Sequence, residues 1–269
     1  MRILRGKMAK FIQPDPSKVL IIDISKWQDD PNTLETVDFV QLRSQGTVGV
    51  IVKCGEANAI DRAFISYVQE MEKYNIPFGV YWYYNNKYPP KKQAKLFVDT
   101  LIKNNVNPKL GMWLDLEDRN PGKYTGWKYW YDFLLQITNE LPERIVGIYT
   151  GHYYFTEYTT LAGIPPQSLA WFAKFPLWIA SYGSSPKYTK PWGDDWLLWQ
   201  FTDLLDGIKF GVDSKELDGN YFNGDIKKFC NYFKIDDVSP QIRWLVRTIY
   251  EYSDGYQEIV EELDNDRKI

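Results

Sequence analysis

Histidine and cysteine are scarce in this chain of 269 residues. The lone histidine, His152, argues against a histidine-rich zinc site, and a Ser-His-Asp or Cys-His catalytic arrangement would have to use this one residue. The two cysteines, Cys54 and Cys230, cannot build a disulfide framework, so we expect reduced thiols and folding in a cytosol. We expect neither a metal nor a cofactor.

Long apolar runs and an excess of positive charge are also missing. Nowhere do about 18 apolar residues follow one another, so we expect no membrane-spanning helix and no membrane insertion. Residues 1–18 form a polar leader without the apolar region of a secretory signal peptide. The formal net charge of −3 leaves no basic surface for nucleic acid. We therefore expect a protein that is made in the cytoplasm and has a neutral or polar partner.

Aromatic residues, in contrast, are abundant. They make up 17% of the sequence, with 11 tryptophans and 20 tyrosines. This is more than a core requires, and rings with a polar tip also stack on sugars. We expect some of these aromatic residues to pack in the core and others to contact a sugar.

Strand and helix patterns alternate along the first part of the chain. Apolar, β-branched runs predict strands over residues 18–25, 47–53, 77–84, 111–116 and 144–150. Helical spacing between them predicts helices over residues 36–44, 63–74, 90–105 and 126–141. Two further strands are predicted at 177–181 and 196–201, and the prolines between them leave no room for a full helix. Such alternation implies a parallel sheet, and the number of units favours an α/β barrel over an open sheet.

The stretch 111–118 carries the strongest chemical signal. Asp115 and Glu117 lie two residues apart in an apolar run, so on a strand both side chains point to the same face. Their Cα atoms would lie roughly 6.6 Å apart, close enough for one carboxyl to raise the proton affinity of the other. The alternative is a strand end whose acids face water or cap the next helix. Asp118 points to the opposite face and should matter least.

In a barrel of this kind the site lies at the carboxyl ends of the strands. Four acids are predicted there: Asp23, Asp115, Glu117 and Asp218. They are accompanied by Tyr81, Tyr83, Tyr149, Trp178, Gln200 and Asn220. Glycosidic cleavage needs one protonated carboxyl for the leaving oxygen and a second carboxylate as nucleophile, base or stabiliser of the cationic transition state. The sequence therefore predicts a site suited to cleaving a glycan.

Short motifs follow one another at these strand ends. They are Asp-Ile-Ser-Lys-Trp-Gln at 23–28, Asp-Leu-Glu at 115–117, Gly-Ile-Tyr-Thr at 147–150, Leu-Trp-Ile-Ala-Ser-Tyr at 177–182, Trp-Gln-Phe-Thr at 199–202 and Asp-Gly-Asn at 218–220. In this order and spacing they resemble the motifs of glycoside hydrolase family 25, from about residue 19 to residue 224. These enzymes are muramidases, or Chalaropsis-type lysozymes, common among bacteriophage endolysins. The resemblance implies an irregular TIM-like barrel with eight strands and about five helices.

The resemblance also implies roles for individual residues. Glu117 would be the proton donor, and Asp115 would tune it or stabilise the cation. Asp23 and Asp218 would complete the acidic cluster. The sugar groove would be lined by Tyr81, Tyr83, Tyr149, Trp178, Gln200 and Asn220. The second step stays open between a carboxylate nucleophile and the substrate's own N-acetyl group. Asp61 matches a family acid, and we expect it to be a helix N-cap.

The implied substrate is bacterial peptidoglycan, cleaved at the β-1,4 bond between N-acetylmuramic acid and N-acetylglucosamine. We expect a phage or prophage lytic enzyme that reaches the cell wall with the help of a separate, holin-like release protein. One alternative is a hydrolase of chitin or another N-acetyl glycan, but the upstream aspartates of the chitinase pattern are replaced by Met112 and apolar neighbours. The other is a non-catalytic glycan-binding barrel of a phage tail or wall-anchoring protein, which would need no buried acids.

The composition changes from residue 229 onward. Apolar residues at 242, 245, 246, 249 and 250 share one helical face, and those at 259 and 263 suggest a second short helix. We therefore expect three parts: an N-terminal leader at 1–18, a catalytic barrel at 19–228 and a small helical segment at 229–269. We expect the last segment to dock on the barrel.

Overall fold

The computed structural model describes residues 11–29, 37–161, 163–187 and 189–236. The helices predicted around residues 242–250 and 259–263 lie outside the described residues, as does the first part of the leader. Within the described ranges, no helix has the length and apolar character needed to cross a membrane.

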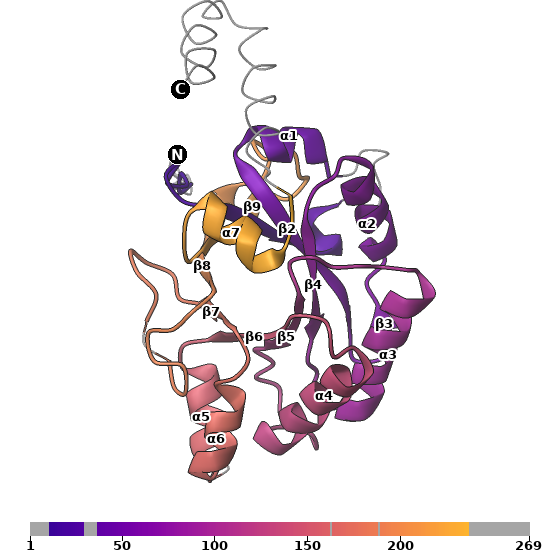
Figure 1. The fold of residues 1–269 in the computed structure, drawn as a ribbon, viewed down its shortest axis with the longest axis vertical. Coiled ribbons are helices and arrows are strands. Elements are labelled where there is room, and N and C mark those ends of the chain that lie inside the picture. Colours follow the sequence, from indigo (N-terminus) through magenta and orange to yellow (C-terminus); the bar gives the residue numbers. More distant parts are fainter. Residues whose placement is uncertain (1–10, 30–36, 162, 188, 237–269) are drawn as a thin grey trace, which may run out of the picture.

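Eight strands close into a barrel (Figure 1), as the sequence predicts. They are β1 (Leu20–Ile24), β2 (Thr47–Glu56), β4 (Phe78–Tyr83), β5 (Met112–Leu116), β6 (Val146–Gly151), β7 (Leu177–Ala180), β8 (Leu198–Asp206) and β9 (Glu216–Phe222). The order around the barrel is β1-β9-β8-β7-β6-β5-β4-β2, and a parallel β1–β2 pair closes it. β9 runs antiparallel to both of its neighbours, which makes the barrel irregular. A short strand, β3 (Ala59–Ile60), extends β2 as a hairpin.

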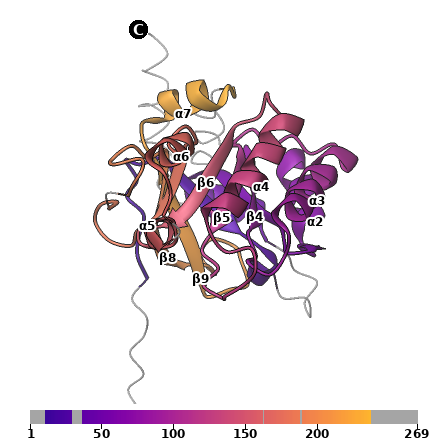
Figure 2. The same ribbon diagram turned by 90° about the horizontal axis from the view of Figure 1, so that it is seen from below.

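The helices of the described residues differ in number from the expectation. They are α1 (Phe39–Ser44), α2 (Phe64–Lys73), α3 (Pro90–Lys103), α4 (Trp127–Glu140), α5 (Tyr154–Leu161), α6 (Pro166–Phe172) and α7 (Ile226–Phe233), with a 3-10 turn, η1 (Lys26–Gln28). Figure 2 shows α2, α3 and α4 on the outer side of the strands. About five helices were expected. The two short helices α5 and α6 lie between β6 and β7, where the helical pattern is weak.

Two apolar cores hold the barrel together. One lies between the strands and the outer helices, and the other fills the barrel interior. Trp113 and Trp178 form the centre of the interior core, with ring centroids 5.7 Å apart in an edge-to-face contact. Phe229 and Phe233 of α7 belong to the same interior core. The predicted division of the chain at residue 229 thus falls within a helix that packs into the barrel, and the three-part division stays a prediction.

Gly147 on β6 provides the space that Trp113 occupies. A Cβ at residue 147 would lie 2.3 Å from the Trp113 ring, whereas a Cβ at Gly151, on the same strand, would meet nothing within 4 Å. The interior core therefore depends on a missing side chain at this point.

We expect Gly147→Ala to lower the free energy of unfolding by about 1–3 kcal/mol, because an added methyl group overpacks the interior. Urea denaturation measures the change. Gly151→Ala is the matched control, since it alters the unfolded chain in the same way without a clash. Equal stability of the two variants would contradict this account of the interior core.

Candidate active site

The strand register brings the predicted acids to one mouth of the barrel. Asp23 on β1 lies directly opposite Asp218 on the antiparallel strand β9. Asp115 on β5 has Tyr83 of β4 and Tyr149 of β6 as its register partners. Side chains of register partners share one face of a sheet, and here that face is the barrel interior. Residues distant in sequence are thus assembled at the carboxyl ends of the parallel strands.

Hydrogen bonds hold Asp23 in a fixed position. Its Oδ2 accepts from Asn220 Nδ2 at 2.7 Å and from Gln200 Nε2 at 3.2 Å. Trp178 Nε1 donates to Asn220 Oδ1 at 2.7 Å, and Tyr149 donates to Gln200 Oε1 at 2.9 Å. A continuous chain of donors therefore runs from the interior core to the carboxylate.

These contacts bear on the predicted sugar groove. Trp178 and Asn220 are only 2% and 0% exposed and lie against the interior core and Asp23. The geometry therefore favours a supporting role for both over direct contact with a sugar. Tyr81 and Tyr83 are half-buried on β4. Contact of the predicted groove residues with substrate stays a prediction.

Burial raises the pKa of the carboxylates in the cluster. Desolvation lifts the pKa of Asp23 to about 6, against the lowering effect of its hydrogen bonds from Asn220 and Gln200. It also lifts the pKa of Asp218 to about 9, and the charge of Asp23 adds to this shift. The cluster therefore retains protons that isolated carboxyl groups would lose at neutral pH.

Asp115 and Glu117 form a closely interacting pair with unequal access to solvent. Asp115 is 4% exposed, and its Oδ1 has no hydrogen-bond partner. Glu117, directly after β5, is exposed at the mouth. Desolvation and the charge of Glu117 raise the pKa of Asp115, while desolvation and the charge of Asp23 raise the pKa of Glu117. The two carboxyl groups thus bind protons as a pair, and Glu117 is the member that can reach a bound molecule.

Two residues of the site were not singled out from the sequence. Lys53, at an inward-facing position of β2, is 7% exposed and its Nζ lies 2.5 Å from Glu56 Oε2. The signal available was a lysine at the end of an otherwise apolar strand. Tyr182 is 53% exposed and donates to Gln200 Oε1 at 3.2 Å. It lies within the motif at 177–182 and presents an open ring at the mouth.

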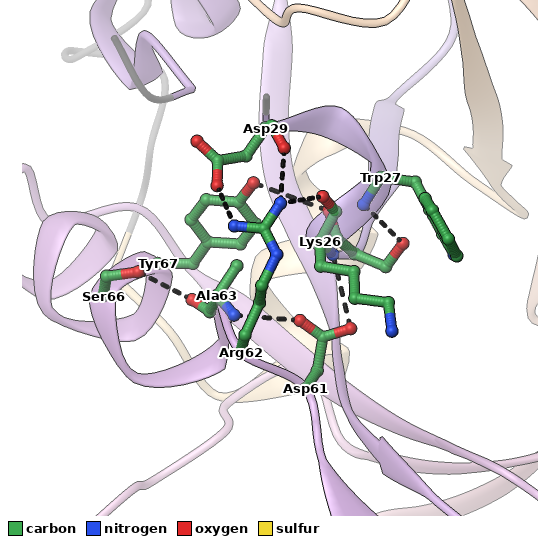
Figure 3. A network of polar contacts seen from close by, with 9 residues as sticks. Lys26, Trp27, Asp29, Asp61, Arg62, Ala63, Ser66 and Tyr67 are labelled. Carbon is green, nitrogen blue, oxygen red and sulfur yellow. Dashed lines mark hydrogen bonds and ion pairs between the residues drawn. The ribbon is translucent and has the colours of Figure 1, made fainter. Parts of the chain in front are cut away.

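The turn after β1 is fixed by a polar network (Figure 3). Asp61 accepts from the backbone N–H groups of Lys26 and Ala63, at 3.3 and 3.0 Å. Arg62 donates to the carboxylate of Asp29 at 2.8 Å and to the Lys26 carbonyl at 3.1 Å. The N-cap of α2 is Ala63, so the expectation that Asp61 caps the helix is wrong in detail. Asp61 instead ties the start of α2 to the turn that follows Asp23.

Asp118 points away from the mouth, as expected, but it is not a passive residue. It is 1% exposed and accepts from the backbone N–H groups of Asn86 and Asn120, each at 2.9 Å, and from Asn120 Nδ2 at 2.7 Å. The expectation that it should matter least has to be corrected for stability. The opposite face of β5 is covered by the outer layer rather than by water, so an acid there needs partners.

The remaining candidates for catalysis or metal binding are not grouped. His152 is half-buried, and its Nδ1 lies 3.2 Å from Thr189 Oγ1. In the part of the chain that the structure describes, no three histidine, cysteine, aspartate or glutamate side chains are arranged to hold a metal ion.

A closed α/β barrel that presents an exposed acid beside buried carboxylates with raised pKa values has the form of a glycoside hydrolase. The chain belongs to glycosyl hydrolases family 25, whose family model matches residues 22–207. The resemblance noted from the motifs is thereby confirmed, and so is the expectation of a glycoside hydrolase. The matched range ends before β9, so Asp218 and Asn220 lie beyond it.

Solved structures share the fold. A family 25 glycosyl hydrolase from Bacillus anthracis is 19% identical, with a TM-score of 0.62 over 84% of this chain and 99% of that one. The catalytic domain of an endolysin from a bacteriophage of Listeria monocytogenes is 20% identical, with a TM-score of 0.61 over 81% and 98%. A muramidase from Acremonium alcalophilum is 23% identical, with a TM-score of 0.61 over 80% and 99%. The comparison with curated proteins gives no match.

The raised pKa of Asp23 makes stability depend on pH. The folded state keeps this proton up to about pH 6, whereas the unfolded chain loses it near pH 3.8. The folded state is therefore favoured below about pH 4 and loses this advantage as the pH rises through 6. We expect Asp23 to account for a loss of about 2 kcal/mol in the free energy of unfolding between pH 4 and 7. Denaturant titrations of wild type and Asp23→Asn measure it, and an equal loss in both proteins would contradict this assignment.

Removing the Asp118 carboxylate leaves the N–H groups of Asn86 and Asn120 without their acceptor. We expect Asp118→Ala to lower the free energy of unfolding by about 3 kcal/mol. Asp99→Ala is the control, because Asp99 forms an exposed pair with Lys95 and such pairs contribute little. Thermal and urea unfolding measure both variants. A loss no larger than that of the control would show that Asp118 is dispensable.

Proposed function

We propose that this glycoside hydrolase is a muramidase that cleaves the β-1,4 bond between N-acetylmuramic acid and N-acetylglucosamine in bacterial peptidoglycan. The observation that carries the proposal is the Asp115–Glu117 pair, in which one carboxyl is exposed at the barrel mouth and the other is buried behind it. Membership of family 25 supports it, and similar structures are described as a muramidase and an endolysin.

Glu117 is the proton donor. Its exposed position lets it reach the oxygen of the leaving sugar, and burial and the charge of Asp23, which raise its pKa, strengthen its hold on the proton that it donates. In the form that reacts, the pair holds one proton on Glu117, and the ionised Asp115 behind it balances the positive charge that develops on the sugar. The carboxylate of Asp23, held by two amide side chains, adds to this balance.

The sugar chain lies across the mouth, against rings that flank the carboxylates. Tyr83 on β4 and the exposed ring of Tyr182 suit this role by their position. Tyr81, Tyr149 and Gln200 lie closer to the interior. They form the bottom of the sugar groove, and its shape determines how the substrate binds. Aromatic faces bind the apolar faces of sugars without forming a charge contact.

The biological setting that we propose is lysis. The enzyme is made in the cytoplasm and reaches the cell wall through membrane holes formed by a separate, holin-like protein. The likeness to the catalytic domain of a phage endolysin supports this setting. A non-catalytic glycan-binding barrel has less support, because binding alone does not require buried carboxylates, which cost stability.

We expect Glu117→Gln to lose activity by about a hundredfold or more, the typical effect of removing a general acid. The measurement is the release of reducing ends of muramic acid from purified peptidoglycan. Glu143→Gln is the control, since Glu143 is exposed and lies before β6, at the other end of the strands. Full activity of Glu117→Gln would refute the donor assignment. No release by wild type from any wall type would favour the glycan-binding module.

A further inference from the structure

Lys53 is a buried cation inside an acidic site. Its side chain is 9% exposed, and it lies two residues after Ile51 of the interior core, on the same face of β2. A buried ammonium group needs a partner to offset its desolvation. Glu56 provides one, at 2.5 Å, and the Tyr83 ring lies 4.9 Å from Nζ as a cation–π contact. The lysine is therefore held at a defined position rather than extended into water.

The strand register connects this lysine to the acid pair. Glu56 on β2 is the register partner of Tyr83 on β4, and Tyr83 is the register partner of Asp115 on β5. This row places Glu56 and Asp115 on either side of β4, and Lys53, whose own register partner is Tyr81, contacts the row through Glu56 and the Tyr83 ring.

Asp115 has a need that this lysine meets. Its Oδ1 is buried and accepts no hydrogen bond, so the anion lacks the usual means of stabilisation. Titratable groups from five neighbouring elements face Asp115. They are Glu117, which follows the same strand, Tyr81 and Tyr83 on β4, Tyr149 on β6, Tyr154 on α5, Lys53 and Glu56 on β2, and Asp23 on β1. Of the charges that act most strongly on Asp115, Lys53 is positive, whereas Glu117, Asp23 and Glu56 are negative.

We propose that Lys53, held by Glu56 and Tyr83, is the counter-charge of Asp115 and a positioning residue that directs the proton of the acid pair to Glu117. This inference rests on the proposed role of Glu117 as donor. Without the lysine charge, the buried anion at Asp115 becomes less stable, and the proton moves from the exposed carboxyl to the buried one. Glu117 then has no proton to donate, although both acids are present.

The proposal predicts the direction in which the pH–activity profile moves. The acid limb reports ionisation of Asp115, and the alkaline limb reports loss of the Glu117 proton. In Lys53→Met both limbs should move to higher pH, by about one pH unit or more for the acid limb, because the charge of Lys53 lowers the pKa of Asp115 and losing an opposite charge has an effect of this order. Activity at pH 5 should fall at least tenfold. A lysine with only a structural role would lower activity without moving the profile.

Three further variants serve as controls. Lys53→Arg keeps the charge and should leave the profile in place. Glu56→Gln removes a negative charge near Asp115, so its profile should move to lower pH, opposite to Lys53→Met. Lys95→Met breaks an exposed pair with Asp99 and should change nothing. Unmoved limbs in Lys53→Met, or a shift of Glu56→Gln to higher pH, would overturn the proposal.

A readout that does not depend on activity separates this proposal from the proposed function. Carbon-13 NMR of labelled aspartate follows the titration of Asp115, assigned by comparison with Asp115→Asn. The Asp115 signal should titrate at higher pH in Lys53→Met than in wild type. If wild type cleaves no peptidoglycan but this shift occurs, the muramidase assignment fails and the counter-charge stands. If cleavage is normal and the signal does not shift, the counter-charge fails alone.

Discussion

The burial of carboxylates at the barrel mouth, to which their mutual repulsion adds, is the constraint on which the site depends. Asp23 faces Asp218 across the β1–β9 pair, and Asp115 lies two residues from Glu117. Like charges so placed, and partly removed from water, disfavour their own ionised forms. The rest of the site limits this cost with amide donors on Asp23 and with the charge of Lys53, which lowers the pKa of both Asp115 and Glu117. Catalytic pKa values and reduced stability therefore have the same cause.

The interior core holds the carboxylate of Asp23 in one orientation despite the cost of burying it. Trp178 contacts Trp113 and Tyr149 edge to face and donates through its indole to Asn220, which in turn holds Asp23. An aromatic interior has few alternative packings, so the amide of Asn220 cannot turn away from the carboxylate. α7 completes the same core with its phenylalanines. Packing beneath the mouth thus sets the orientation of an acid at the mouth.

The acids could be predicted from the sequence because the carboxyl ends of parallel strands meet at one end of a barrel. Other features could not be read from local patterns. Alternation along a strand predicts that Trp178 faces the barrel interior, but not how deeply its side chain is buried. That burial decides whether the ring supports Asn220 or contacts a sugar. Lys53 ends an apolar run, and only the folded structure shows its contacts with Glu56 and the Tyr83 ring. Asp118 was placed on the correct face, but that face is covered by helices and loops rather than by water.

Strand β9 shows how one irregularity serves the whole site. Because it runs antiparallel to β1, its first residues, rather than its last, lie at the mouth. Asp218 therefore meets Asp23 there, and Asn220, two residues further on and on the same face, reaches Asp23 from below. One strand thus delivers both the carboxyl of Asp218, whose pKa is raised by burial and by the charge of Asp23, and the amide of Asn220, which lowers the pKa of Asp23. In a parallel strand with the same sequence, Asn220 rather than Asp218 would lie nearer the mouth. The opposing effects of burial and amide donors on the pKa of Asp23 would then be lost.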